Sequence, residues 1–229
     1  MFEEKLREFL KEEDVQGPIL KKVFRFLGFN IALLLFKTRI TPNQVTILKF
    51  LLTIPAAYLF YLSGHLNLIL GAAILLISFI LDYADGSLAR LRKTQSTMGY
   101  WIDHATDEVS KFLLFFAITL GLYNKLGDFM VWIFGFLSIS AYYMGSLLYL
   151  YFKAGFQSVA TKIIEKEKEK RKFAKQFFFI DPFVTAIILL AAFLNQMYSL
   201  LIFSAVYGWI FVIVAFILLT KKIVKQDTS

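Results

Sequence analysis

The sequence predicts an all-α membrane protein: six transmembrane helices preceded by a cytoplasmic, interfacial amphipathic helix. Three observations predict this class. Hydrophobic residues make up 58% of the 229 residues and charged residues only 18%, which is unlike a soluble globular domain. Apolar segments of roughly 20 residues, the length that crosses a bilayer, follow one another along the chain. There is no cysteine, which excludes disulfides and thiolate metal sites.

Residues 1–40 are expected to form an N-terminal interfacial arm, and residues 41–229 a six-helix membrane domain. Apolar side chains between Ile19 and Ile31 recur at helical spacing beside lysines and arginines, which is typical of a helix lying along a membrane surface. A seventh span through residues 26–36 is the alternative, but eleven residues are too few to cross a bilayer.

The six expected spans follow the arm and are joined mainly by short loops. They are placed at about residues 42–63, 66–90, 98–123, 127–152, 177–195 and 198–220. Thr41 and Pro42 mark the start of the first span, because a capping hydroxyl followed by proline at the first helical position is a helix-start signal.

The positions of lysine and arginine predict the orientation. Nearly all of the 25 basic residues fall in the arm, in the loops after the second and fourth spans, and in the C-terminal tail. All of these segments lie on one side, so the positive-inside rule places both termini on the cytoplasmic side of the cell membrane. A basic surface facing anionic lipid accounts for the net charge of +8, and no nucleic-acid partner is needed to explain it.

Four aspartates interrupt the second and third expected spans: Asp82, Asp85, Asp103 and Asp107. A carboxylate at membrane depth costs about 2.5–3.5 kcal/mol on insertion scales, so four of them need a compensating positive charge. Bound metal ions are the simplest source of that charge. With no cysteine and only two histidines, the metal must be held by oxygen, which indicates magnesium, manganese or calcium.

Helical spacing predicts that these carboxylates converge. At about 100° per residue, the two aspartates of each span share one face, together with the small residues Gly86, Ala89 and Gly99. The loop over residues 91–98 is short, so the two helices are antiparallel neighbours with their carboxylates near the cytoplasmic boundary. Carboxylates from two facing helices can bind a pair of divalent ions, an arrangement suited to phosphoryl chemistry. The pattern therefore indicates an enzyme that acts on a diphosphate.

The motif Asp-x2-Asp-Gly-x2-Ala-Arg-x8-Gly-x3-Asp-x3-Asp, which begins at Asp82, resembles the signature of the CDP-alcohol phosphotransferase family. All eight of its defining positions match. The segment from Thr41 to Thr46 resembles the motif that opens the family's first membrane helix. These motifs cover about residues 40–110, and elsewhere the agreement is architectural only.

The resemblance implies a single-displacement transfer. A CDP-linked alcohol, often CDP-diacylglycerol or its archaeal ether-lipid equivalent, would pass its phosphoalcohol to the hydroxyl of a polar acceptor and release CMP. The resemblance also implies a homodimer and two divalent cations, Mg²⁺ or Mn²⁺ with Ca²⁺ as a substitute. It makes the four aspartates the metal ligands and Asp107 the general base as well. The residues that it assigns to the cytidine diphosphate are Asn43, Thr46, Gly86, Ala89, Arg90, Ser96 and Gly99.

Several alternatives stay open. A CDP-amino-alcohol of the ethanolamine or choline type could react with a lipid alcohol at the same motif. An intramembrane prenyltransferase also binds magnesium diphosphate through aspartates, and a cation transporter places carboxylates at mid-membrane. Asn43, Thr46 and Ser96 are equally consistent with helix-start residues. Lys49 and Lys111 either balance the acidic cluster, which is the favoured interpretation, or bind a phosphate of the acceptor.

Overall fold

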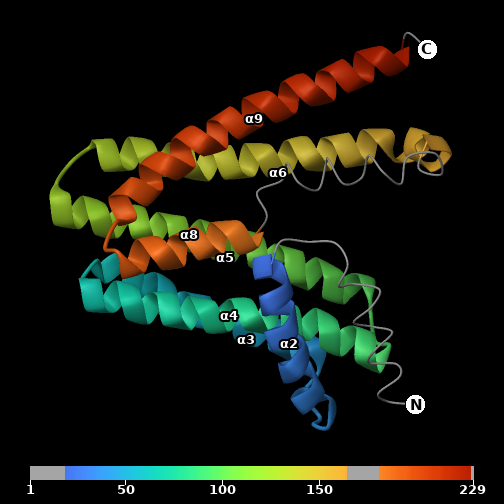
Figure 1. Cartoon of the computed structure of the whole chain (residues 1–229), viewed down its shortest axis with the longest axis horizontal. Coiled ribbons are helices and arrows are strands. Elements are labelled where there is room, and N and C mark those ends of the chain that lie inside the picture. Colours follow the sequence, from blue (N-terminus) through green and yellow to red (C-terminus); the bar gives the residue numbers. More distant parts are fainter. Residues whose placement is uncertain (1–18, 164–180, 228–229) are drawn as a thin grey trace. The chain divides into compact units, whose positions relative to one another are not determined.

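The computed structural model of the protein describes residues 19–163 and 181–227, and within these residues every regular element is a helix. Figure 1 labels the seven helices. They are α2 (Ile19–Phe36), α3 (Pro42–Leu62), α4 (His65–Arg92), α5 (Thr97–Leu126), α6 (Met130–Ile163), α8 (Asp181–Phe193) and α9 (Met197–Asp227).

Five of these helices, α3 to α6 and α9, are long and apolar enough to cross a membrane. The prediction of an all-helical, multi-pass membrane protein is confirmed at this level. The fifth expected span, residues 177–195, corresponds to α8, which has 13 residues in the described part of the chain. The described part of the chain leaves out residues 177–180 and the first 18 residues of the arm, so the count of six spans and the amphipathic arm stay predictions.

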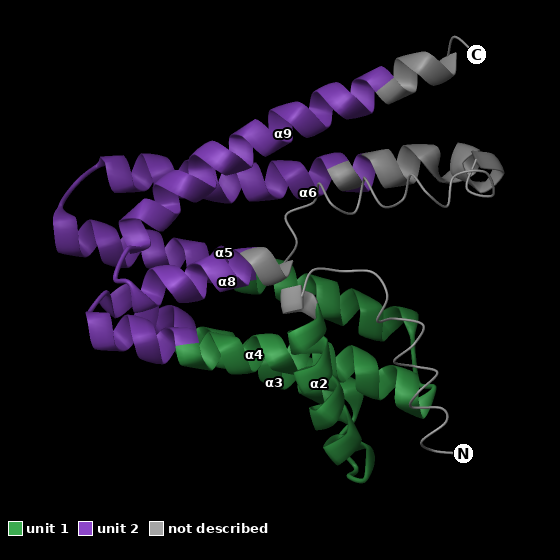
Figure 2. Cartoon of the chain, in the orientation of Figure 1, with its two compact units in different colours: residues 1–55, 73–110 green, residues 56–72, 111–229 purple. Residues whose placement is uncertain are grey.

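The chain forms two compact units, coloured separately in Figure 2. The first unit contains residues 1–55 and 73–110, and the second contains residues 56–72 and 111–229. In the second unit α9 packs against both α6 and α8. Buried hydroxyls join α6 to α9: the Ser138 hydroxyl lies 3.0 Å from the Leu201 carbonyl oxygen and 3.0 Å from the Ser204 hydroxyl.

The first unit holds the four aspartates of the motif. Its core is built from small and branched side chains of α2, α3 and α4, among them the buried residues Ala32, Val45 and Leu88. The start of α3 follows the predicted signal. The Thr41 hydroxyl accepts the Gln44 N–H at 3.3 Å, and the Gln44 side chain accepts the Thr41 N–H at 2.8 Å, which forms a capping box around Pro42.

Gly28 lets α2 approach α4 closely. A β-carbon at this position would lie 2.9 Å from the carbonyl carbon of Tyr83, closer than a real β-carbon approaches, and 3.0 Å from the nitrogen of Ala84. The two helices therefore touch through the backbone between Asp82 and Asp85.

We expect Gly28→Ala to lower the free energy of unfolding by about 1–3 kcal/mol, the usual cost of overpacking, because α2 would have to move away from α4. Thermal unfolding of the purified protein in detergent measures this loss. The matched control is Gly145→Ala on α6, where the nearest atom to a new β-carbon is 3.8 Å away. That control should unfold at the wild-type temperature or above, and equal midpoints for both variants would contradict the close contact.

Arg92, the last residue of α4, binds the segment that connects α2 to α3. Its guanidinium donates to the carbonyl oxygens of Leu35 at 2.7 Å and Thr38 at 2.8 Å, and it also reaches those of Phe36 and Ile40. The last carbonyls of a helix have no partner within that helix, so a cation at this place satisfies groups that would otherwise need water.

Arg92→Met is expected to destabilise the first unit by about 1.5–3 kcal/mol, the contribution of hydrogen bonds made by a charged group. A lower midpoint of thermal unfolding would report this effect. Lys93→Met is the control, since it removes an exposed positive charge from the adjacent position. If both variants lost the same stability, general charge rather than the guanidinium contacts would be responsible.

Candidate metal centre

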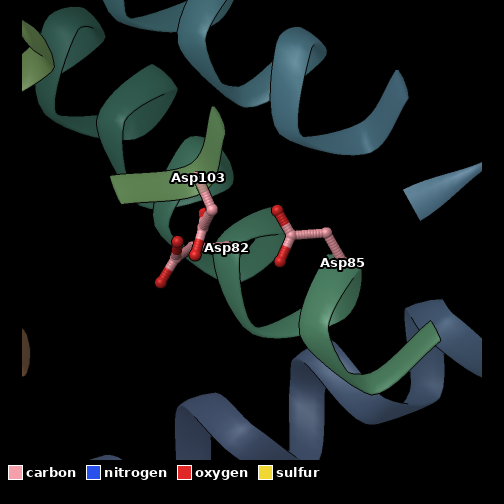
Figure 3. A group of neighbouring side chains, drawn as sticks. All are labelled: Asp82, Asp85 and Asp103. Carbon is pink, nitrogen blue, oxygen red and sulfur yellow. The ribbon is translucent and has the colours of Figure 1, made fainter. Parts of the chain in front are cut away.

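Three of the four aspartates meet at one point. Oxygen atoms of Asp82 and Asp85, from α4, and of Asp103, from α5, all lie within 4.8 Å of one another. Figure 3 shows the three side chains close together, with the Asp85 carboxylate pointing toward Asp82 and Asp103. The predicted convergence of carboxylates from the two helices is therefore confirmed for three of the four, and their role as metal ligands stays a prediction.

Lys49, from α3, connects Asp107 to this group. Its ammonium lies 2.8 Å from Asp107 Oδ1 and 3.9 Å from Asp85 Oδ2, and it donates hydrogen bonds to Asp82 and Asp103. Only 4% of Lys49 is exposed. Of the two interpretations of this lysine, the contacts support charge balance of the acidic cluster.

The four carboxylates differ in their access to solvent. The side chain of Asp85 is 6% exposed, whereas those of Asp82, Asp103 and Asp107 are each about a third exposed. Asp85 accepts a hydrogen bond of 2.7 Å from the buried Thr46 hydroxyl, which partly replaces the water that it lacks. The cluster thus has a buried end at Asp85 and an open end at the other three.

Two hydroxyls hold the backbone of Lys49. Ser78 donates to the Lys49 carbonyl oxygen at 2.9 Å, and Thr53 donates to the same oxygen at 3.2 Å. Neither residue was predicted from the sequence. A signal existed, since Thr53 lies one turn after Lys49 and Ser78 one turn before Asp82, each inside an apolar run.

The residues expected to contact a nucleotide lie in two groups. At the end of α4, a β-carbon on Gly86 would lie 3.4 Å from the Arg90 guanidinium, which also donates to Ser87 at 3.2 Å. Ala89, partly exposed between them, accepts the Thr94 N–H at 3.0 Å where α4 ends.

The second group lies at the start of α5. Ser96 accepts the Gly99 N–H at 3.0 Å and so caps the helix. A β-carbon on Gly99 would lie 3.1 Å from Asn43 Oδ1, which places Asn43 beside this turn. The Ser96 hydroxyl makes the cap expected of a helix-start residue, whereas Thr46 donates a hydrogen bond to Asp85.

Lys111 belongs to the second unit, and its ammonium lies over the Tyr142 ring, 5.0 Å from its centre.

The acidic group fits a hard divalent cation. All of its donors are carboxylate oxygens, the ligands that magnesium and manganese prefer. The Lys49 ammonium already lies among these oxygens, so the site accepts positive charge at the expected place.

A family-wide sequence pattern described as CDP-alcohol phosphatidyltransferase matches residues 39–220. Because the match covers most of the sequence, the chain belongs to this family. The family resemblance suggested by the aspartate motif is therefore confirmed.

Among curated proteins, the chain is similar to the archaetidylinositol phosphate synthase of Pyrococcus horikoshii, with 39% identity over 45% of this chain and 52% of the relative. It is also 36% identical to the phosphatidylinositol phosphate synthase of Corynebacterium glutamicum, over 39% of this chain and 40% of the relative. A bifunctional IPC transferase and DIPP synthase of Aquifex aeolicus shows 28% identity over 69% of this chain and 37% of the relative. The chain thus spans about half, or less, of the length of these relatives.

Two solved structures of the Mycobacterium tuberculosis phosphatidylinositol phosphate synthase share the fold. One has CDP-DAG bound and a TM-score of 0.63, covering 84% of this chain and 92% of that chain. The other contains manganese and citrate and has a TM-score of 0.64, covering 84% and 88%. Sequence identity is 20% in both comparisons, so the likeness establishes the fold.

Proposed function

We propose that the protein is a metal-dependent membrane phosphotransferase of phospholipid biosynthesis. It moves the phosphoalcohol group of a CDP-alcohol, CDP-diacylglycerol or an ether-lipid equivalent, to the hydroxyl of a polar acceptor, and CMP leaves. The observation that carries this proposal is the meeting of the motif's carboxylates from α4 and α5 around a single positive charge. Membership of the CDP-alcohol phosphatidyltransferase family supports the choice of a CDP-linked donor.

In this proposal Asp82, Asp85, Asp103 and Asp107 hold two divalent cations, Mg²⁺ or Mn²⁺, with Ca²⁺ as a substitute. When bound, the cations neutralise the diphosphate and stabilise the charge that develops on the leaving CMP. The manganese in the structure of the mycobacterial relative supports this choice of metal. Thr46 keeps the Asp85 carboxylate oriented through its hydrogen bond of 2.7 Å.

The remaining roles follow from the chemistry of each side chain. Asp107, at the open end of the cluster, accepts the proton of the attacking hydroxyl. The Arg90 guanidinium donates two parallel hydrogen bonds to phosphate oxygens, a bidentate geometry that lysine cannot reproduce. Gly86 and Ala89 leave room for the nucleotide beside Arg90, while Asn43, Ser96 and Gly99 contact it at the start of α5.

The membrane arrangement belongs to the same proposal. Residues 1–40 form an interfacial arm ahead of a membrane domain at 41–229, and α8 together with the residues before it supplies the fifth of the six spans. The basic segments put both termini and the carboxylate cluster on the cytoplasmic side. The family resemblance suggests a homodimer.

The acceptor is proposed to be a phosphorylated inositol. Two relatives, those from Pyrococcus horikoshii and Corynebacterium glutamicum, are named for lipid-linked inositol phosphates. Other relatives are named putative cardiolipin synthases, so alcohols other than inositol phosphate are also tested as acceptors.

The test is a CMP-release assay on the purified protein in detergent with Mg²⁺. CDP-diacylglycerol and its ether analogue are each offered with inositol phosphate, inositol, glycerol phosphate or serine, and CDP-ethanolamine is offered with diacylglycerol. Release of CMP that requires both a CDP-lipid and a polar acceptor is expected, fastest with inositol phosphate. If CDP-ethanolamine were the only donor that released CMP, the lipid would be the acceptor and not part of the donor. If no donor and acceptor pair released CMP, the proposed function would be refuted.

A further inference from the structure

The Lys49 ammonium lies where the proposed function requires divalent cations. It touches Asp82, Asp103 and Asp107, and it lies 3.9 Å from Asp85. A single lysine therefore contacts every carboxylate of the signature, although it lies outside the signature and on a third helix.

We propose that Lys49 is a built-in counter-cation of the metal site, which holds the four carboxylates together until divalent cations bind and which those cations must displace. The inference rests on the proposed function, because that function assigns the carboxylates to metal. It adds that this chain supplies its own competitor for the site.

Competition follows from the contacts. The oxygens Asp82 Oδ1 and Asp103 Oδ1 both accept hydrogen bonds from the ammonium, so they cannot turn fully to a metal while it stays. The Lys49 ammonium and a metal ion on the same oxygens would also repel each other strongly, because Lys49 is almost fully buried and water screens its charge little. With all four carboxylates ionised, one ammonium leaves the cluster three negative charges in excess. That excess draws in divalent cations, and with two of them bound the positive charge of Lys49 is no longer needed there.

Only the side chain of Lys49 has to move. Its carbonyl oxygen is fixed by the Ser78 and Thr53 hydroxyls, so α3 keeps its place against α4. The lysine stem has four flexible carbon–carbon links, which allow the ammonium to swing out without a helix shift. Metal binding then selects the form with the ammonium withdrawn. The apparent affinity for the metal equals the affinity of that form multiplied by the fraction of the protein that adopts it.

The experiment measures Mn²⁺ binding to the full-length protein and to Lys49→Met, which keeps the apolar length and removes the charge. Bound Mn²⁺ loses the sharp electron paramagnetic resonance spectrum of the aqueous ion, so titration gives the affinity without turnover. We expect Lys49→Met to bind Mn²⁺ about tenfold more tightly than the wild type. Lys93→Met is the matched control: it removes an exposed lysine of the same unit and should leave the affinity unchanged.

Thermal unfolding gives the second measurement. In excess chelator, Lys49→Met should unfold at a lower temperature than the wild type, since four carboxylates then repel one another with no cation between them. Mn²⁺ should restore the midpoint, so the metal-induced rise is larger in the variant than in the wild type. If the variant folds only when it is purified with Mn²⁺, that rescue equally supports the proposal.

Two outcomes overturn the inference. Mn²⁺ affinity in Lys49→Met that is weaker than in the wild type, or less than threefold tighter, means that the ammonium does not compete. A variant that stays unfolded with and without Mn²⁺ means that Lys49 is still required in the loaded site. Both readouts are independent of CMP release, so an inactive wild-type protein that binds Mn²⁺ would refute the proposed transfer but not the competition. Equal Mn²⁺ binding by the wild type and Asp82→Asn would refute the metal site itself.

Discussion

Asp107→Asn is expected to lower the rate of CMP release by about 10²–10⁴-fold, the contribution of a positioned general base. Asparagine has the same shape as aspartate and keeps one oxygen for the Lys49 ammonium, which lies 2.8 Å from Asp107 Oδ1. It cannot take a proton from the acceptor hydroxyl. The measurement is the initial rate with saturating donor and acceptor.

A matched control separates loss of the base from a general effect of removing a carboxylate. Asp128, in the loop before α6, accepts the Met130 N–H at 2.9 Å, and an asparagine side chain can do the same. Asp128→Asn should therefore keep the wild-type rate. Mn²⁺ binding by Asp107→Asn should survive in weakened form, because three carboxylates remain. Full turnover in this variant would show that another group takes the proton.

Removing divalent cations is expected to suppress CMP release by more than about a hundredfold, because stabilisation of several kcal/mol is lost at the diphosphate. The protein is assayed in excess chelator and then again after Mg²⁺ or Mn²⁺ is added back beyond the chelator concentration. Activity should return with either ion, since both accept carboxylate oxygens.

The control for this experiment is chelator already saturated with Mg²⁺, which exposes the protein to the same reagent without removing metal. That sample should retain the untreated rate. Undiminished release in excess free chelator would instead mean that the carboxylates and Lys49 suffice without a metal, and the assignment of Asp82, Asp85 and Asp103 as ligands would have to be withdrawn.

The convergence of the aspartates could be predicted because it depends on local features. Spacing of three and four residues places carboxylates on one helix face, and a short loop makes α4 and α5 neighbours. The capping box at Thr41 is local as well, since both partners lie within one turn. Such features survive in any fold that forms the helices at all.

The position of Lys49 was harder to predict because it depends on how α3 is rotated. Apolar residues occur on every side of that helix, so hydrophobicity alone does not say which face turns inward. In a bilayer the polar side chains carry this information, since they avoid lipid. Thr46, Lys49 and Thr53 are spaced by three and four residues and are all buried, whereas Leu48 and Leu51 are exposed. The stripe of polar residues identifies the inward face, which agrees with the favoured prediction that Lys49 balances the acidic cluster.

Arg92 could not have been assigned to its contacts from sequence. Its partners are the backbone carbonyls of residues 35–40, and carbonyls are present whatever the side chains are. In the sequence, such an arginine is indistinguishable from one that only marks the cytoplasmic side.

The close contact of Gly28 with the backbone of Tyr83 and Ala84 has a mechanical consequence. The contacted backbone lies between Asp82 and Asp85, so a movement of α2 toward α4 would press on the segment that carries these two carboxylates. If the bilayer surface holds α2, as proposed, lateral pressure and lipid packing would bear directly on the reaction centre. The rate of the proposed transfer would then respond to the physical state of the membrane.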